Sequence, residues 1–243
     1  MYLTRPKFWV SGNKVATALG FTPIRIPPRR PSLLPEFDFH RDFVASYDSR
    51  IVINGDQEII NQLRQYWVLN KPQQRRYLQS RGVKIPEDYD AHEDKWVIRP
   101  NRHTKGQHFQ VVTGYRDVPS SHYIAPLFPK VSEWRMVFVK GQRAYTMRKD
   151  LPIEGIPVDQ PWNHANGSSF MTFRERTAPV ELATSVLADL QQLPIIKDAH
   201  IMLADIMVDA NNNYAVCETG FLPGLSIAAN VQTIANTWRD YHG

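Results

Sequence analysis

The chain has 243 residues, of which 42% are hydrophobic, so it can bury a large core in one domain or in two small ones. Its formal net charge of +5 would permit binding to polyanions, but the basic residues are spread along the sequence rather than gathered in one block. A single cysteine, Cys217, excludes an intrachain disulfide, and the sequence has neither a membrane-spanning apolar run nor an apolar signal segment. We therefore expect a cytoplasmic protein.

The N-terminal part is rich in proline and predicts a short, irregular region with strand candidates at 6–10 and 51–54. The densest basic segment of the chain, "RIPPRR", lies at 25–30. One alternative function is therefore nucleic-acid binding through this segment, which would weaken steeply with added salt. The other interpretation of the segment is a solvated loop. After the apolar run "RIVINGD", residues 59–67 have the apolar spacing of a helix.

The middle of the chain alternates helices and strands. The stretch "NKPQQRRYLQSRGVKIPE" predicts a helix with Pro72 in its first turn and its end at Gly82. An amphipathic helix is expected from about Pro179. The expected strands are at residues 95–101, 109–112, 122–128, 133–149 (two strands) and 200–218 (two strands). This order predicts the α+β class.

Two acidic residues interrupt the apolar hairpin at 200–218. A loop of Asn211 and Asn212, or a loop of four residues, would place Asp205 opposite Glu218, with Cβ atoms ~4.5–5.5 Å apart. A three-residue loop would shift this register by one residue, and a solvated acidic face is the other alternative. Apolar neighbours predict that at least one acid is partly buried, so a positive group should lie between them. Two carboxylates suit a Mg²⁺ ion that bridges to nucleotide phosphates.

A second hairpin, "EWRMVFVKGQRAYTMRKD", gathers positive charge. A turn at residues 141–142 would place Arg148 opposite Arg135 and would return Lys149 close to Glu133. Two facing guanidinium groups would be stabilised by an anion such as a transferring phosphoryl group. The alternative is that the acids at the ends of the hairpin form surface ion pairs with the arginines, which would stabilise little.

These stretches, in this order, resemble the ATP-grasp superfamily, in particular the ribosomal-protein glutamate ligase and similar carboxylate–amine ligases. The resemblance implies an α+β ATP-grasp fold in which two α+β subdomains clasp ATP. It also implies a reduced N-terminal domain at 1–65 and an ATP-grasp domain at 66–243. The central and C-terminal subdomains would then span about 95–130 and 131–243.

The resemblance assigns nucleotide-binding roles to five residues. "NKPQQRRYLQSRGVKIPE" is similar to the family segment that begins with a phosphate-binding lysine, here Lys71. "WVIRPNRHTKGQHF" is similar to a strand and its following Gly-rich loop, which implies phosphate contacts from Arg99, where lysine is usual, and Lys105. "HYIAPLF" is similar to the hinge strand, so backbone groups near Ala125 and Leu127 would hold adenine.

Catalytic roles follow from two further stretches. "EWRMVFVKGQRAYTMRK" is similar to the family's Glu/Asp-x-Arg-x-x-Val strand with its Arg-Lys return, which assigns Arg135, Arg148 and Lys149. "WNHANGSSF" is similar to an Arg-x-Asn segment that lines the site, and this likeness indicates Asn163.

The last stretch, "LADIMVDANNNYAVCETGFLPGL", is similar to the family's terminal metal hairpin and assigns Asp205 and Glu218 as Mg²⁺ ligands. Gly220 stands where the family has a metal-binding asparagine, which leaves two side-chain ligands and water to complete the coordination.

The resemblance implies an ATP- and Mg²⁺-dependent ligase that joins a carboxylate to an amine through an acyl phosphate. Its partners would be small-molecule or peptide carboxylates and amines, without a membrane or nucleic acid, and a homo-oligomer is left open. The resemblance also suggests a phage or another compact genome as the source. The main alternative is a nucleotide-binding or partner-binding protein of the same fold without ligase activity, and the third is the nucleic-acid-binding protein.

Overall fold

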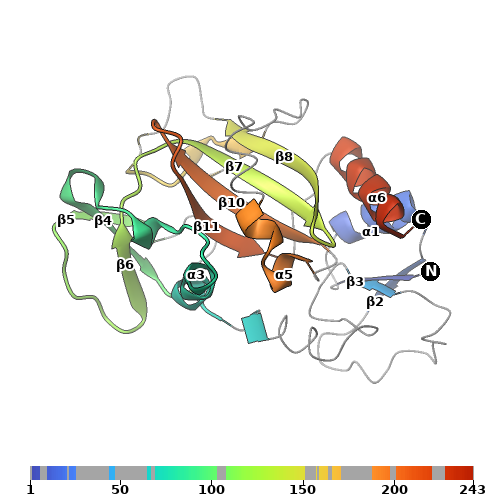
Figure 1. The fold of residues 1–243 in the computed structure, drawn as a ribbon, viewed down its shortest axis with the longest axis horizontal. Helices are drawn as coiled ribbons and strands as arrows, with labels where there is room; N and C mark the ends of the chain where they lie inside the picture. Colours follow the sequence, from blue (N-terminus) through green and yellow to red (C-terminus); the bar gives the residue numbers. More distant parts are fainter. Residues whose placement is uncertain are drawn as a thin grey trace.

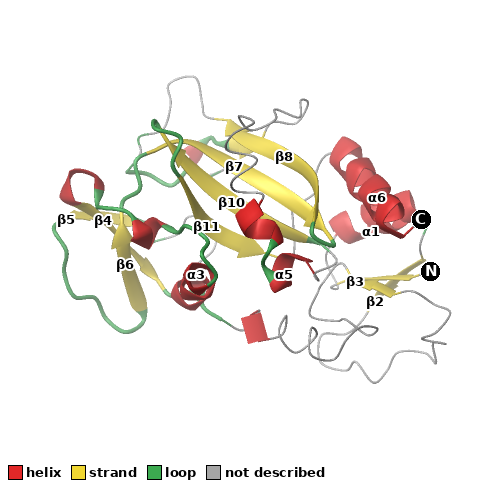
Figure 2. Cartoon of the chain, in the orientation of Figure 1, coloured by secondary structure: helices red, strands yellow, loops and turns green. Residues whose placement is uncertain are grey.

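The computed structural model contains three β-sheets and several helices, arranged as Figure 1 and Figure 2 show. It describes residues 2–5, 10–20, 22–25, 44–46, 65–66, 69–102, 108–150, 157, 159–163, 166–170, 188–197, 201–220 and 228–242. The mixture of helices with antiparallel sheets agrees with the predicted α+β class. Within these residues, no helix is both long and apolar enough to cross a membrane.

The N-terminal residues form a small parallel sheet with the strand order β2-β1-β3. Its elements are β1 (Tyr2–Arg5), α1 (Val10–Leu19), β2 (Thr22–Arg25) and β3 (Val44–Ser46). The strand predicted at 6–10 is wrong at Val10, which begins a helix, and the strand candidate at 51–54 lies outside the described residues. Packing explains the difference, because α1 buries Val15 and Ala16 in a core that it shares with the C-terminal helix.

The central region agrees closely with the prediction. Its elements are α3 (Lys71–Ser80), the short 3₁₀ helices η2 (Pro86–Asp88) and η3 (His92–Asp94), and the strands β4 (Lys95–Pro100), β5 (Gln110–Thr113) and β6 (His122–Pro126). Asn70 caps α3 by accepting a hydrogen bond from the Gln73 amide, and Gly82 follows its end with φ +80°. The three strands form an antiparallel sheet in the order β5-β4-β6.

The largest sheet has five strands in the order β11-β10-β7-β8-β9, and every neighbouring pair is antiparallel. Its strands are β7 (Lys130–Val139), β8 (Gln142–Asp150), β9 (Ser169–Phe170), β10 (Met202–Asp209) and β11 (Tyr214–Gly220), with the helices α5 (Pro194–Lys197) and α6 (Ala228–His242). Of the helix predicted from about Pro179, residues 188–191 are helical and Leu190 is fully buried, while residues 179–187 lie outside the described part.

Two apolar cores cover the two faces of this sheet. On one face, Met136 and Ile206 join a cluster that includes Leu78 of α3. On the other face, Val137 and Leu203 pack with residues of α6 and α1, which lie together at one end of the molecule in Figure 1. Charged side chains continue this second face beyond its apolar rows, and they form the candidate site described next.

Candidate functional site

The two acids of the C-terminal hairpin lie opposite each other on neighbouring strands, as predicted. The register pairs Asp205 of β10 with Glu218 of β11, so both side chains belong to the same face of the sheet. The Asp205 side chain is 16% exposed and the Glu218 side chain is 45% exposed. One carboxylate is therefore mostly buried, while the other can reach solvent or a ligand.

The loop that joins these strands is the three-residue alternative and not the favoured loop of two or four residues. The Asp209 amide donates to the Asn213 carbonyl at 3.0 Å, which leaves three residues, 210–212, in the loop instead of two or four. With this loop and a regular β11, Asp205 and Glu218 would not have been opposite each other. However, a bulge at Cys217 adds one residue to β11 between the pairs Ile206–Val216 and Asp205–Glu218, and it restores the opposition of the acids.

Each acid has a cationic partner, which agrees with the expectation of positive charge at this position. Arg135 of β7 is paired in register with Asp205 and donates to both carboxylate oxygens, at 2.6 and 2.7 Å. Lys71 at the start of α3 forms an ion pair with Glu218. Burial alone would raise the pKa of Asp205, but Arg135, with Lys149 and Lys71, brings it below its ordinary value. Asp205 is therefore a carboxylate at neutral pH.

The predicted position of Arg148 is wrong. The turn between β7 and β8 consists of Lys140 and Gly141, which have φ +48° and +75°, the signs that a tight two-residue hairpin turn requires. Together with a bulge near Val137, this turn places Arg148 opposite Trp134, and the guanidinium carbon lies 5.9 Å from the centre of that indole. Arg148 is thus on the opposite face of the sheet from Arg135.

Lys149 lies on the same face as Arg135 and belongs to a buried charge cluster. Its ammonium group forms an ion pair with Glu133, whose other carboxylate oxygen accepts a hydrogen bond from Lys130 at 2.5 Å. The Lys130 ammonium lies 4.6 Å from the centre of the Trp162 ring, and burial lowers the pKa of Lys130 although Glu133 opposes this shift. Glu133 therefore pairs with two lysines rather than forming the surface ion pairs with arginine that were the alternative.

Asn163 follows Trp162 in the chain, so its backbone lies near this cluster. Its side-chain oxygen accepts a hydrogen bond from the Asn166 amide at 2.9 Å, which closes a local turn. The assignment of Asn163 to the site stays a prediction.

Of the nucleotide-binding residues assigned from the sequence, Lys71 lies on α3, Arg99 and Ala125 lie on strands of the β5-β4-β6 sheet, and Leu127 follows β6. Lys71 is in the site through its contact with Glu218, and Arg99 of β4 has its guanidinium carbon 5.6 Å from the Phe109 ring centre. Burial lowers the pKa of Arg99, and the nearby Arg75 contributes in the same direction. Lys105 lies outside the described residues.

Arg75 is a site-adjacent residue that sequence reasoning missed. It donates to Glu87 at 2.9 Å and to the Cys217 carbonyl at 3.4 Å, and its guanidinium carbon lies 5.1 Å from the Tyr123 ring centre. Arg75 therefore connects α3 to β11 and to Tyr123 of the β5-β4-β6 sheet. Its spacing of four residues from Lys71, one helical turn, was the only signal in the sequence that could have indicated it.

Ala125 and Leu127, assigned to the adenine contact, are both buried. The Leu127 amide donates to the Lys95 carbonyl at 2.9 Å, and the Leu127 carbonyl accepts from the His92 amide at 3.2 Å. Ala125 is paired with Val97 inside the sheet. An adenine contact at Leu127 would have to share or displace these hydrogen bonds, so it stays a prediction.

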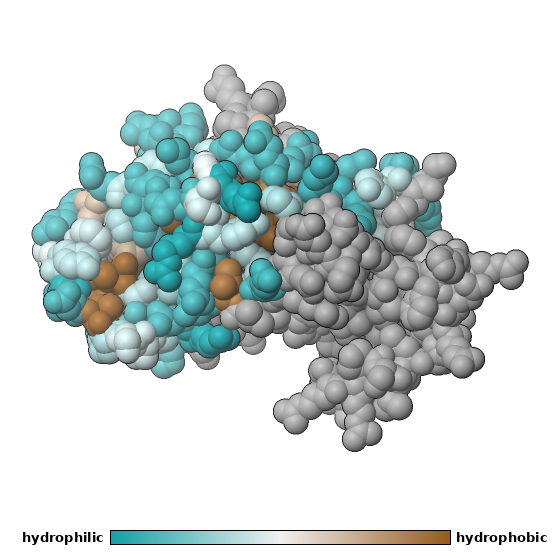
Figure 3. Space-filling model, turned by 60° about the horizontal axis from the view of Figure 1, so that its bottom comes forward, coloured by the Kyte–Doolittle hydropathy of each residue, from teal (hydrophilic) through white to brown (hydrophobic). Residues whose placement is uncertain are grey.

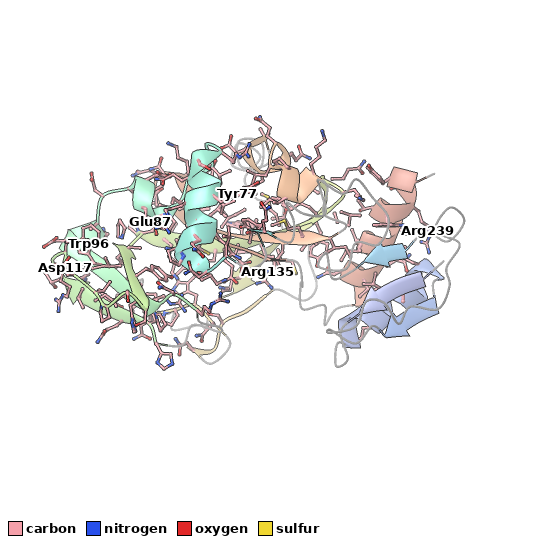
Figure 4. The ribbon with its side chains drawn as sticks, turned by 90° about the horizontal axis from the view of Figure 1, so that it is seen from below. Tyr77, Glu87, Trp96, Asp117, Arg135 and Arg239 are labelled. Carbon is pink, nitrogen blue, oxygen red and sulfur yellow. The ribbon has the colours of Figure 1, made fainter. Side chains whose placement is uncertain are left out.

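The two carboxylates fit a hard divalent cation by their chemistry, because Mg²⁺ prefers oxygen ligands and keeps several waters. Among the described residues, no third His, Cys, Asp or Glu joins them in a group that could hold a metal ion. Gly220 pairs with Leu203 in the register, and a Cβ built there would meet the Leu203 side chain at 3.7 Å. Figure 4 labels Arg135, which belongs to the five-stranded sheet, beside α3, the helix that supplies Lys71.

No protein-family model matches the chain, and no curated protein matches it. Solved structures match it over nearly its whole length. The D-alanine–D-alanine ligase from Bacillus anthracis, complexed with ATP, is 13% identical with a TM-score of 0.57, and the match covers 100% of this chain and 99% of that one. A RimK-domain ATP-grasp protein from Sphaerobacter thermophilus is 10% identical with a TM-score of 0.57, covering 99% and 98%.

A third solved structure is an ATP-grasp ligase associated with a ribosomally made peptide in Chryseobacterium gregarium, in complex with ADP and a leader and core peptide. It is 12% identical with a TM-score of 0.56, and the match covers 99% of this chain and 96% of that one. These likenesses, together with the sheet order and the opposed acids, confirm at the level of the fold what the sequence resemblance implied. The chain has the ATP-grasp fold.

Proposed function

We propose that the protein is an ATP- and Mg²⁺-dependent ligase that joins a carboxylate to an amine through an acyl phosphate. The observation that carries this proposal is the pair of opposed acids, Asp205 and Glu218, each in contact with a cation. Arg135 and Lys71 supply these cations from a neighbouring strand and a neighbouring helix. Such a reaction needs carboxylates to hold a metal and cations to bind phosphates. Here each carboxylate has a cation as its neighbour: Arg135 beside Asp205 and Lys71 beside Glu218.

In this proposal Asp205 and Glu218 hold Mg²⁺, with water as the remaining ligands. A metal held there would neutralise negative charge on the phosphate oxygens of ATP during transfer of the γ-phosphoryl group. In the free protein the two acids pair with Arg135 and Lys71, and both cations would become available to anionic ligands if the acids held a metal instead.

The cationic residues around the two acids have distinct roles in this proposal. Lys71 and Arg99 bind the nucleotide phosphates, and Arg75 adds positive charge while it keeps α3 against β11. Although burial lowers the pKa of Arg99, a guanidinium group is so strongly basic that it stays protonated at neutral pH. Arg135 and Lys149 stabilise the negative charge of the acyl phosphate and of the state that the amine forms with it.

No step of the proposed reaction requires a covalent bond between substrate and protein. A carboxylate oxygen of the substrate takes the γ-phosphoryl group of ATP, and ADP leaves. The amine nitrogen then attacks the acyl carbon, the amide bond forms as the C–O bond to phosphate breaks, and the nitrogen loses a proton. Burial and the acids around it raise the pKa of Cys217 to about 12, so this thiol is not a nucleophile at neutral pH.

The substrates belong to the class of small-molecule or peptide carboxylates and amines. The solved structures support both kinds, since one is a D-alanine–D-alanine ligase and another holds a leader and core peptide. The division of the chain into a reduced N-terminal domain at 1–65 and an ATP-grasp domain at 66–243 is part of the same proposal.

A specific observation favours one alternative, a protein of the same fold that binds a nucleotide without ligation. Gly220 follows Glu218 by two residues on the same face of β11 and adds no third ligand. If two carboxylates bind the metal only weakly, the protein would lose ligation while it still binds the nucleotide.

The distinguishing experiment measures ADP release with ATP, Mg²⁺, hydroxylamine and a panel of carboxylates. The panel consists of acetate, L- and D-alanine, L-glutamate and short peptides. Hydroxylamine converts an acyl phosphate into a hydroxamate, so the product reports the proposed intermediate directly. The expected result is hydroxamate formation with at least one carboxylate, and a loss of about 100-fold or more in Arg135→Gln.

The matched control is Arg116→Gln, because Arg116 is exposed and donates to the nearby Thr113 carbonyl at 3.1 Å, and its loss should leave the rate unchanged. ATP binding without hydroxamate or ADP from any carboxylate would contradict the ligase proposal and favour the nucleotide-binding alternative.

A further inference from the structure

Tyr145 is a buried tyrosine next to the site, and the proposed function gives it no role. Tyr145 of β8 is 3% exposed, and its hydroxyl oxygen is buried. Among the described residues, no group forms a hydrogen bond with this hydroxyl. A buried hydroxyl that has lost its hydrogen bonds to water lowers the stability of the fold, so phenylalanine would suit the free protein better.

The position of Tyr145 relative to Arg135 follows from the sheet register. Arg135 is opposite Met147, and the next pair on the same face is Val137 opposite Tyr145. The phenol therefore lies one row from the Arg135–Asp205 contact, on the face that carries the proposed reaction.

The surroundings of Tyr145 combine apolar contacts with one strong charge. Its side chain belongs to the core cluster that includes Val137, Leu203 and Met147, and the Met147 sulfur accepts a hydrogen bond from the Asn230 amide group at 3.1 Å. Burial raises the pKa of Tyr145, and the positive charge of Arg135 opposes that shift only in part. The phenol is thus protonated at neutral pH and available as a hydrogen-bond donor.

We propose that Tyr145 donates a hydrogen bond to an oxygen of the substrate carboxylate beside Arg135, and that it is a specificity-determining residue of the acyl site. A carboxylate oxygen offers the acceptor that the hydroxyl lacks in the free protein, and Arg135 supplies the charge that attracts it. This inference rests on the proposed ligase function, and it adds a neutral donor that the sequence resemblance did not assign.

The test compares wild type with Tyr145→Phe, which removes one oxygen and keeps the ring. The matched control is Tyr115→Phe, since Tyr115 is 64% exposed and makes an edge-to-face contact with Trp96, which Figure 4 shows far from Arg135. For each protein we would measure the urea midpoint of unfolding without ligand and the affinity for ATP with Mg²⁺. We would also measure KM and kcat for the carboxylate that gives hydroxamate.

The expected result for Tyr145→Phe is an unfolding midpoint equal to or above that of wild type and an unchanged ATP affinity. The KM for the carboxylate should rise by about tenfold, which corresponds to one hydrogen bond in a buried site. A fall in the unfolding midpoint would show that the hydroxyl has a partner in the free protein, and it would overturn the inference.

Failure of the inference and failure of the proposed function give different results. An active wild type with an unaffected Tyr145→Phe variant overturns the role of Tyr145 alone. A wild type that yields no hydroxamate with any carboxylate overturns the ligase proposal, and the role of Tyr145 falls with it.

Discussion

Asp205 shows how one side chain can be both buried and charged. Moving a carboxylate out of water is costly, and the cost is repaid only where the partner has good geometry. Arg135 provides this geometry with two parallel N–H donors to the two carboxylate oxygens. The same contact keeps Asp205 from repelling Glu218 across the hairpin, since the charge next to Glu218 is largely neutralised.

Replacement of Asp205 by asparagine should lower stability in a pH-dependent way. The variant leaves Arg135 buried without its charge partner, which should cost about 2–4 kcal/mol of unfolding free energy near pH 7. Because the pKa of Asp205 is lowered in the folded state, its contribution is complete above about pH 4, the usual range of an unfolded aspartate, and is lost as the pH falls further.

The measurement is urea unfolding of both proteins from about pH 7 down to the acidic range. The difference in unfolding free energy should be constant at neutral pH and should shrink below about pH 4. An equal difference at all pH values would show that the Asp205 charge does not stabilise the fold.

At the same scale, the sequence predicted the members of the site better than their contacts. Asp205 and Glu218 were recognisable because a charged side chain in an apolar hairpin is costly to bury without a partner. For Arg75 the sequence offers only its spacing of four residues from Lys71, because its partners Glu87 and Tyr123 come from other elements that only the folded chain brings together.

At the scale of elements, the two hairpins show why register is the weak point of prediction. A shift of one residue moves a side chain to the other face of the sheet. Near Val137 a bulge and the position of the turn put Arg148 on the opposite face from Arg135. In the other hairpin a three-residue loop and the bulge at Cys217 compensate, so Asp205 and Glu218 face each other although the loop was predicted wrongly.

The strands themselves were predictable from apolar runs and turn residues, and α3 from its cap, its proline and its terminal glycine. Bulges were not predictable, because each depends on packing against the opposite strand and the core. The helix α1 was missed for a similar reason, since its burial against α6 is a long-range contact.

The β7–β8 turn offers a test at this scale with a matched pair of glycines. Gly141 and Gly82 have similar positive φ values, +75° and +80°. A Cβ on Gly141 would lie 3.0 Å from the Lys197 backbone, whereas a Cβ on Gly82 would meet nothing within 4 Å. Gly82→Ala should therefore cost about 1 kcal/mol from backbone conformation alone, and Gly141→Ala about 2–4 kcal/mol.

Urea unfolding of the two variants checks this difference. Equal losses of stability would mean that the contact between the turn and α5 does not restrict the β7–β8 hairpin, and that only the backbone conformation matters.

At the scale of the whole molecule, both termini lie near α6, at the end of the molecule opposite the three-stranded sheet β5-β4-β6 (Figure 1). The three-stranded sheet and α3 contribute Lys71, Arg75 and Arg99, and the five-stranded sheet contributes Arg135 and both acids. In Figure 3 the described part of the visible face is mainly hydrophilic, with separate apolar areas. The net charge of +5 and this distribution favour an anionic ligand between the sheets.

The most direct test of the site is calorimetric titration of ATP with and without Mg²⁺. The proteins compared are wild type, Asp205→Asn and Glu218→Gln. A matched control is Glu93→Gln, because Glu93 is 61% exposed and forms its ion pair with Lys95 rather than with a residue of the candidate site. Circular dichroism before each titration confirms that every variant is folded.

A metal–nucleotide site predicts that ATP binding to wild type depends on Mg²⁺ and weakens by about tenfold or more in both site variants. Glu93→Gln should bind as wild type does. Equal ATP affinity in all four proteins, or affinity that does not respond to Mg²⁺, would show that the opposed acids are not a metal–nucleotide site, and the ligase proposal would fall with them.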